Sequence, residues 1–168
     1  AVDAAGNVLD WTYDGWSTPH GTRPGGKAGN LLSARYLEKP FEQPTPGEGG
    51  PPNFAAGRNA IAIYEFPGHH VTTHFTTEMP VRVSSTRGLG AYANVFAIES
   101  FIDELAHAAG VDPVEYRLRF LKDERAREVL SKCAENFGWS SYKKQANRGR
   151  GIGFARYKNT AAYAAVLA

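Results

Sequence analysis

One cysteine, Cys133, is present among the 168 residues. A lone cysteine excludes an internal disulfide and every CxxC metal or redox motif, so an iron–sulfur cluster would have to be held elsewhere. Cys133 lies on the same expected helical stripe as Val129, Leu130 and Phe137. This position predicts a small buried apolar side chain and not a nucleophile.

Long apolar runs and blocks of like charge are also absent. No stretch approaches the roughly 18 apolar residues of a membrane-spanning helix, and the N-terminus lacks a charged start followed by an apolar segment. The 19 basic and 17 acidic residues are interspersed and leave a formal net charge of +2. The one local basic cluster is typical of a loop and consists of Lys143, Lys144, Arg148 and Arg150. These features indicate no nucleic-acid or anionic-membrane partner.

Two common catalytic motifs are missing as well. There is no GxSxG and no glycine-rich loop ending in GK[ST], so hydrolase and nucleotide-triphosphatase functions have no support. Three histidines, His69, His70 and His74, raise a metal hypothesis because imidazole is the commonest metal ligand. In an extended strand, however, His70 and His74 would lie about 13 Å apart and His69 would point to the other face. We therefore expect surface histidines and no metal site.

The first half of the chain predicts strands and loops. Residues 44–52 hold four prolines and three glycines, so this segment is expected to be a surface loop. The segments Ala60–Phe66 and Val71–Phe75, joined by Pro67-Gly68 as a turn, predict a β-hairpin. The other expected elements are a strand over Val8–Trp16 and a short helix over Leu31–Leu37.

The clearest helix is expected from about Tyr92 to Ala109. Its apolar residues recur every three or four positions, as one face of a helix requires. This stripe consists of Val95, Ile98, Ile102, Leu105 and Ala109. Gly110 is expected to end the helix.

Two further helices and two strands follow. Asp112 is a candidate N-cap, with Pro113 at the first helical position and Glu115 placed as in a capping box. A third helix should run from about Asp123-Glu124 to Gly138. The segments Ile152–Tyr157 and Ala161–Leu167 read as strands around Asn159. Mixed strands and three consecutive helices predict an α+β fold, and residues 1–168 are taken as a single partial domain.

Charged residues on these helices receive structural interpretations. Glu99 and Asp103 are one helical turn apart and could form an acid–base pair with Glu104 beside them. We favour a position at the polar flank, where they would hold a neighbouring arginine or backbone amides of the loop at Arg87. The alternating signs that include Arg117 and Arg119 are typical of a solvated or subunit-contacting helix face.

A loop of sequence Arg87-Gly88-Leu89-Gly90 precedes the clearest helix. A cation, two glycines and a helix N-terminus together suit an anionic or electron-rich ligand. Taken alone, an RGxG sequence is more typical of a tight turn whose arginine is solvated or paired with a carboxylate.

The sequence around this loop resembles one enzyme family. The similar segments are Thr86–Tyr92, Asn94–Ala106, Gly110–Leu118, Arg125–Leu130 and Phe137–Trp139, with weaker similarity at Asp10–Trp11, Trp16–His20 and Gly151–Tyr157. They resemble the molybdopterin-binding large subunit of bacterial molybdenum hydroxylases, the relatives of xanthine dehydrogenase and aldehyde oxidase. The branch that includes isoquinoline oxidoreductase and nicotinate dehydrogenase is the most similar. Because such subunits are several times longer, the resemblance implies a central fragment of the molybdenum-cofactor-binding domain.

The resemblance also implies roles for the loop. Arg87, Gly88 and Gly90 would contact the cofactor, mainly through the backbone, and Leu89 would form part of the substrate wall. Leu89 stands where the xanthine-oxidising pattern has an aromatic residue, so stacking on a purine-like substrate is not expected. The catalytic base, a glutamate, would lie beyond Ala168. No catalytic residue is therefore expected within this fragment, which should be inactive alone.

For the parent protein, the resemblance implies oxidation of an aldehyde or N-heterocycle with water as the oxygen source. The implied cofactors are molybdopterin cytosine dinucleotide with molybdenum, and iron–sulfur clusters in a partner subunit. The implied partners are the remainder of the large subunit, an iron–sulfur small subunit and a cytochrome c subunit. Periplasm or the cytoplasmic-membrane face is the location expected by family analogy. The alternative is a non-catalytic α+β structural or subunit-interaction module.

Overall fold

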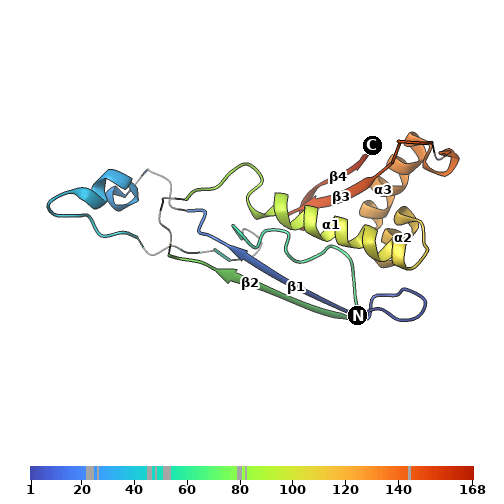
Figure 1. Ribbon diagram of the computed structural model, residues 1–168, viewed down its shortest axis with the longest axis horizontal. Coiled ribbons are helices and arrows are strands. Elements are labelled where there is room, and N and C mark those ends of the chain that lie inside the picture. Colours follow the sequence, from blue (N-terminus) through green and yellow to red (C-terminus); the bar gives the residue numbers. More distant parts are fainter. Residues whose placement is uncertain are drawn as a thin grey trace.

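The computed structural model describes residues 1–21, 25, 27–44, 47, 49–50, 54–78, 81, 83–143 and 145–168. Two pairs of strands and three α-helices form an α+β fold, as predicted (Figure 1). The strands are β1 (Asp10–Ser17), β2 (Gly68–Phe75), β3 (Ile152–Tyr157) and β4 (Ala161–Leu167). The α-helices are α1 (Gly90–Ala108), α2 (Pro113–Phe120) and α3 (Glu124–Phe137). Short 3-10 helices are η1 (Ala28–Asn30), η2 (Leu32–Tyr36) and η3 (Trp139–Ser141).

The β1–β2 pair corrects the predicted hairpin. β2 pairs in parallel with β1, from Asp10 opposite Gly68 to Ser17 opposite Phe75, and the segment Ala60–Phe66 forms no strand. A Cβ on Gly68 would lie 2.5 Å from Asp10 Oδ1 and 3.1 Å from Leu9 O. Glycine at position 68 therefore allows a close approach to β1, and the Pro67-Gly68 dipeptide leads into a strand instead of forming a hairpin turn.

The apolar residues of the 60–66 segment enter the core instead of a sheet. Ala60, Ala62, Tyr64 and Phe66 are all buried. The strand-like apolar sequence of this segment is therefore accounted for by packing of alternate residues into the core with the helices. One backbone hydrogen bond, from Glu65 N–H to Phe120 O at 2.8 Å, ties it to the end of α2.

The predicted helix ends are confirmed. At the end of α1, Gly110 has φ +65°, its N–H bonds to His107 O and Val111 N–H bonds to Ala106 O, which is a Schellman arrangement. Asp112 Oδ1 accepts hydrogen bonds from the backbone N–H groups of the first turn of α2. Gly138 ends α3 with φ +73°. These signals act within a few residues, so the sequence alone places them.

The remaining elements also agree with the sequence, with small changes. The short helix expected over Leu31–Leu37 is the 3-10 helix η2, and β3 pairs with β4 in an antiparallel hairpin around Asn159. Cys133 is half-buried and its thiol lies 3.4 Å from Ala165 O, so it contacts β4. The loop expected over 44–52 lies in large part outside the described residues.

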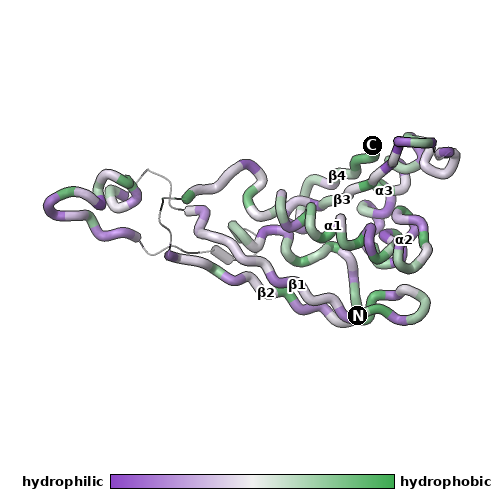
Figure 2. The backbone as a smooth tube through the Cα atoms, viewed as in Figure 1, coloured by the Kyte–Doolittle hydropathy of each residue, from purple (hydrophilic) through white to green (hydrophobic). Residues whose placement is uncertain are grey.

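The core lies where the 60–66 segment, the three helices and the β3–β4 hairpin meet. Its fully buried members include Tyr64, Ile102, Tyr116, Leu121 and Leu130. Figure 2 shows hydrophobic residues gathered at this helical end, whereas the β1–β2 pair is mostly polar in colour. Among the described residues, no helix has the length and apolar character needed to cross a bilayer.

Asp123, the N-cap of α3, provides a pH prediction. Its Oδ1 accepts from Ala126 N–H at 2.8 Å, and its Oδ2 lies 2.6 Å from Arg156 and 3.0 Å from the Tyr163 hydroxyl. The hydrogen bond from Ala126 N–H, supported by Tyr163 and Arg156, holds the pKa of Asp123 below its ordinary 3.8. A lowered folded-state pKa means that the stabilisation is present above pH 3.8 and is lost as the pH falls through the lowered value.

We therefore expect Asp123→Asn to melt at a lower temperature than the wild type at pH 7. The difference should shrink as the pH falls below 3.8 and through the lowered pKa of Asp123, because the carboxyl is then protonated and uncharged like the asparagine side chain. Thermal unfolding of both proteins at pH 7, 5 and 3 measures this difference in melting temperature. A difference that stays constant across this range would show that the charge of Asp123 contributes nothing.

Candidate functional site

The loop before α1 has an unusual backbone. Arg87 is exposed, Gly88 has φ +86°, and Leu89 has φ +54° and ψ −142°. Non-glycine residues seldom adopt such angles, and the strain is of order 1–3 kcal/mol. The loop is closed by hydrogen bonds from Leu89 N–H to Thr86 O at 3.1 Å and from Ala91 N–H to Gly88 O at 3.2 Å. Strain of this kind concentrates at ligand sites, so the backbone itself marks this loop as a candidate site.

The two glycines of the loop have different surroundings. A Cβ on Gly90 would lie 1.8 Å from Ala56 O, and Gly90 N–H already bonds to Ala55 O at 3.0 Å. Among the described residues, a Cβ on Gly88 would meet Tyr92 alone, with its Cβ at 3.5 Å. Gly90 therefore serves contact within the chain, and its amide is not available to a ligand. Gly88 presents the open face of the loop.

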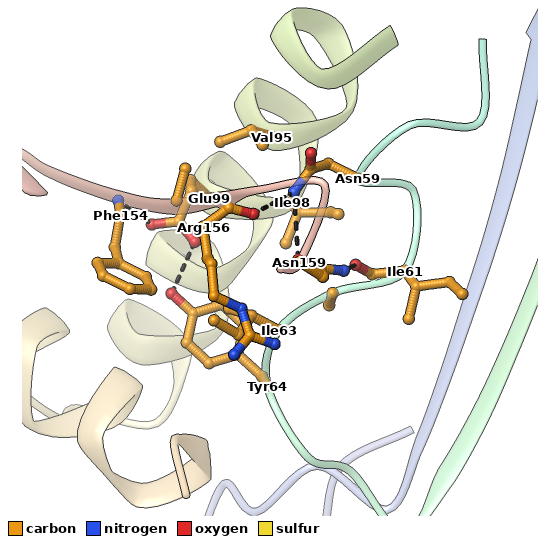
Figure 3. Close-up of a pocket in the computed structure, with 12 residues that line it drawn as sticks. Asn59, Ile61, Ile63, Tyr64, Val95, Ile98, Glu99, Phe154, Arg156 and Asn159 are labelled. Atoms are coloured by element: carbon orange, nitrogen blue, oxygen red, sulfur yellow. Dashed lines mark hydrogen bonds between the residues drawn. The ribbon is translucent and has the colours of Figure 1, made fainter. Parts of the chain in front are cut away.

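The acidic residues of α1 form a buried cluster with an arginine. Glu99 Oε2 accepts from Arg117 Nε at 2.9 Å. Glu99 Oε2 also accepts from Phe154 N–H at 2.8 Å, and Glu99 Oε1 accepts from the Tyr64 hydroxyl at 2.6 Å (Figure 3). Arg117 also contacts Asp103 Oδ1 at 2.6 Å. The predicted pairing of these carboxylates with a neighbouring arginine is confirmed, but the amide that Glu99 binds belongs to β3 and not to the Arg87 loop.

The predicted position of Arg117 is wrong. Its side chain is fully buried, whereas a solvated helix face was expected. Arg117 lies three residues after Val114 and four before Leu121, which are both buried, so it occupies the inner face of α2. Sign alternation does not reveal which face a charge occupies. The spacing from these two apolar residues was the signal that could have found Arg117.

The protonation of this cluster follows from its burial and its contacts. Burial raises the pKa of the Glu99 carboxyl, against the opposing effect of Arg117 and of the Tyr64 and Phe154 hydrogen bonds. Burial would lower the pKa of Arg117, but Glu99 and Tyr64, with Asp103, raise it above its ordinary value. Burial, followed by the charge of Glu99, raises the pKa of Tyr64 well above its ordinary value.

Two hollows border this cluster: a small inner cavity on the Tyr64 side, and a wider open hollow of about 430 Å³ that Glu99, Asp103 and Phe154 help to line. Glu99, Tyr64 and Phe154 help to line a cavity of about 20 Å³ between the 59–64 segment, α1 and β3 (Figure 3). A space of this size accommodates a water molecule and nothing larger. Because the carboxylates of Glu99 and Asp103 are bound by Arg117, and Glu99 also by Phe154 N–H, the cluster acts as an internal tie between α1, α2 and β3.

The histidines lie on the β1–β2 pair. His74 Nε2 is 2.8 Å from Asp14 Oδ1, and its ring stacks on Trp16 with centroids 4.4 Å apart. These contacts are with the opposite strand, as expected of a sheet-surface histidine. Within the described ranges, no group of three or more His, Cys, Asp or Glu residues is placed to hold a metal ion.

Comparison with known proteins shows that the Arg87 loop and the helices that follow it are similar to one family. The profile of the molybdopterin cofactor-binding domain matches residues 48–121, a range that contains the Arg87 loop, α1 and α2. Residues 48–121 are therefore similar to the molybdopterin cofactor-binding domain. The resemblance seen in the sequence is thereby confirmed.

Relatives of known function support the same assignment. The B component of nicotinate dehydrogenase from Pseudomonas putida is 45% identical over 60% of this chain and 9% of its own length. The xanthine dehydrogenase molybdenum-binding subunit of Escherichia coli O157:H7 is 34% identical over 63% of this chain and 17% of its own. The beta subunit of isoquinoline 1-oxidoreductase from Brevundimonas diminuta is 29% identical over 76% of this chain and 15% of its own. The chain thus corresponds to less than a fifth of each of these relatives.

Proposed function

We propose that this chain is part of the large subunit of a molybdenum-dependent hydroxylase or dehydrogenase, and that the Arg87 loop helps to hold the cofactor. The observation that carries the proposal is the strained loop with an open glycine, inside the segment that matches the cofactor-binding domain. A loop that served only as a turn would not require Leu89 in a conformation that favours glycine. The catalytic base would lie outside this chain, which would be inactive alone.

The residues of the loop fit a molybdopterin group. Arg87 is an exposed cation, and a Cβ at Gly88 would have ordinary van der Waals contact with Tyr92 and no clash, so phosphate-like or electron-rich atoms can approach the glycine backbone closely. When bound, the cofactor would supply the oxygen transfer and accept two electrons. Arg87 would balance negative charge, Gly88 would permit contact, and half-buried Leu89 would form part of the substrate wall.

The substrate is best proposed as an N-heterocycle. The names of the three relatives refer to nicotinate, xanthine and isoquinoline, which are all N-heterocycles. Leu89 is aliphatic, so it would contact such a ring through its methyl groups and not by aromatic stacking. An aldehyde substrate is the alternative within the same chemistry, and water would be the oxygen source for both.

The finer features of the whole protein are proposals by analogy. The cofactor would be molybdopterin cytosine dinucleotide, and electrons would pass to iron–sulfur clusters in a small subunit and on to a cytochrome c subunit. The remainder of the large subunit would complete the cofactor site. Periplasm or the cytoplasmic-membrane face is proposed as the location, on family analogy alone.

Gly88→Ala tests the proposal in the full-length protein purified from its own organism. We expect near-equimolar molybdenum and released cytosine nucleotide in the wild type, and loss of most of both in the variant, because the added methyl occupies the open face of the loop. The fold should persist, since the methyl meets only Tyr92 Cβ at 3.5 Å and the positive φ costs about 1 kcal/mol. Elemental analysis and nucleotide release measure the outcome.

Gly110→Ala is the matched control. Gly110 has φ +65° and nothing within 4 Å of the added Cβ, so it carries comparable backbone strain at the other end of α1. It should keep its cofactor. Equal occupancy in the two variants would contradict a cofactor contact at Gly88, and a folded wild type without molybdenum would contradict the function itself.

A further inference from the structure

We infer that Asn94 is a positioning residue that fixes the first turn of α1, and with it the Arg87 loop, on the backbone of residues 55–58. The expected consequence of this positioning, retention of the cofactor, rests on the proposed function. Its structural content, the attachment of the loop, is testable without the cofactor.

The side chain of Asn94 is buried and makes three hydrogen bonds. Nδ2 donates to Ala56 O at 2.8 Å and to Arg58 O at 2.9 Å, and Oδ1 accepts from the Tyr13 hydroxyl at 2.8 Å. Both amide hydrogens are thus used, and the donors and acceptor face three different groups of the chain. Only an amide supplies two donors and an acceptor in this space, which explains a polar residue among buried ones.

Gly90 completes the same attachment. It lies four residues before Asn94, hence on the same face of the helix, and its N–H bonds to Ala55 O at 3.0 Å. The absence of a side chain lets this turn approach Ala56 O more closely than any other residue would permit. The carbonyls of residues 55, 56 and 58 therefore bind two successive points of α1.

Within the part of the chain that the structure describes, the opposite side of this helix start faces solvent. Tyr92 and Phe96 are 81% and 73% exposed, so their side chains do not anchor it. The Arg87 loop joins the helix through the hydrogen bond from Ala91 N–H to Gly88 O. A shift of the turn would consequently move Gly88, and the strained Leu89 conformation could relax, because such strain persists only where surrounding contacts enforce it.

Asn94→Asp is the test. It keeps the size of the side chain but turns the donor toward Ala56 O and Arg58 O into an acceptor, so both carbonyls lose their partner and meet negative charge. The first measurement is the rate of trypsin cleavage after the exposed Arg87, identified by mass spectrometry of the peptide ending there. Protein produced without molybdate is used for every variant, so that a bound cofactor does not shield the loop. We expect cleavage to rise about tenfold or more.

The second measurement is molybdenum and cytosine-nucleotide content in protein produced with molybdate. We expect Asn94→Asp to lose most of both, although Asn94 itself is buried. Tyr13→Phe is the control, because it removes only the bond to Oδ1 and leaves both amide donors on their carbonyls; its cleavage and occupancy should stay close to wild type. Should Asn94→Asp not fold, Asn94→Ser, which can retain one donor, should give intermediate values in both measurements.

The outcomes separate the inference from the proposed function. Faster cleavage with loss of cofactor supports both. Faster cleavage with full occupancy supports the positioning role and counts against a cofactor contact at the loop. Unchanged cleavage in Asn94→Asp overturns the inference, whatever the cofactor content, because the loop would then be held by other contacts. A wild type without cofactor contradicts the proposed function. The cleavage assay alone then decides whether Asn94 positions the Arg87 loop.

Discussion

Replacing Arg117 with methionine should destabilise the region of α1 and α2 by about 3–5 kcal/mol, the cost of breaking a buried ion pair from one side. The guanidinium is fully buried and contacts Glu99 at 2.9 Å and Asp103 at 2.6 Å. Methionine has a similar length and fills much of the space, so the loss of packing is small. The dominant cost is the buried Glu99 carboxylate, which keeps its bonds to Tyr64 and Phe154 but loses its counter-charge.

Hydrogen exchange of peptides from α1 and α2 in the full-length protein measures this local stability. Protection should fall by a factor of about one hundred or more if opening of this region governs exchange. Arg119→Met is the matched control on the same helix, since Arg119 pairs with Glu115 at 3.0 Å on the surface. Exposed pairs of this kind contribute about 0.5 kcal/mol or less. Similar losses in the two variants would show that the Glu99–Arg117 pair does not tie these helices together.

The double variant Glu99→Gln/Arg117→Met separates the charge from the packing. Glutamine has no charge to leave unpaired and can still accept from Tyr64 or Phe154 N–H. We expect the double variant to be more stable than Arg117→Met, because the cost of the single change lies in the isolated carboxylate. A double variant that is less stable than the single one would mean that the remaining side chains, and not the charge, set the stability.

The helices were predictable because their signals are local. Asp112, Asp123, Gly110 and Gly138 act on groups within one turn, and each lies at the helix end that the sequence indicated. The partner of β2 was not predictable in the same way. Pairing with β1 joins residues 58 apart, from Asp10 opposite Gly68, and short apolar segments next to a Pro-Gly dipeptide favour a local hairpin when the pattern alone is considered.

The residues of the candidate loop could be predicted from the sequence, but the contacts that hold the loop in place could not. The loop residues Arg87 to Gly90 could be found from a cation and two glycines before a helix, together with the family resemblance. The partners of Asn94 and Arg117 could not, because the spacing that places a polar residue on the inner face of a helix does not say which groups it contacts. Those partners are the carbonyls of Ala56 and Arg58 for the first, and Glu99 for the second.

Gly90→Ala should destabilise the start of α1 by about 1–3 kcal/mol, as overpacking of a close contact does. The added Cβ would lie 1.8 Å from Ala56 O and 2.8 Å from Ala55 O, and both are backbone atoms that cannot rotate away. The first turn must therefore move off the 55–58 segment, which breaks the bond from Gly90 N–H to Ala55 O. We expect this variant to reproduce the two effects of Asn94→Asp, faster trypsin cleavage after Arg87 and loss of cofactor.

Gly88→Ala and the double variant give this prediction its controls. Gly88→Ala adds the same methyl two residues earlier, where it makes ordinary contact with Tyr92 and no clash, so it should lose cofactor without the increase in cleavage measured in molybdate-free protein. Gly90→Ala/Asn94→Asp should cleave scarcely faster than either single variant, because both changes detach the same turn and neighbouring effects of this kind do not add. Full additivity would mean that Gly90 and Asn94 hold the helix independently, and an unaltered cleavage rate in Gly90→Ala would show that the contact with Ala56 yields without moving the loop.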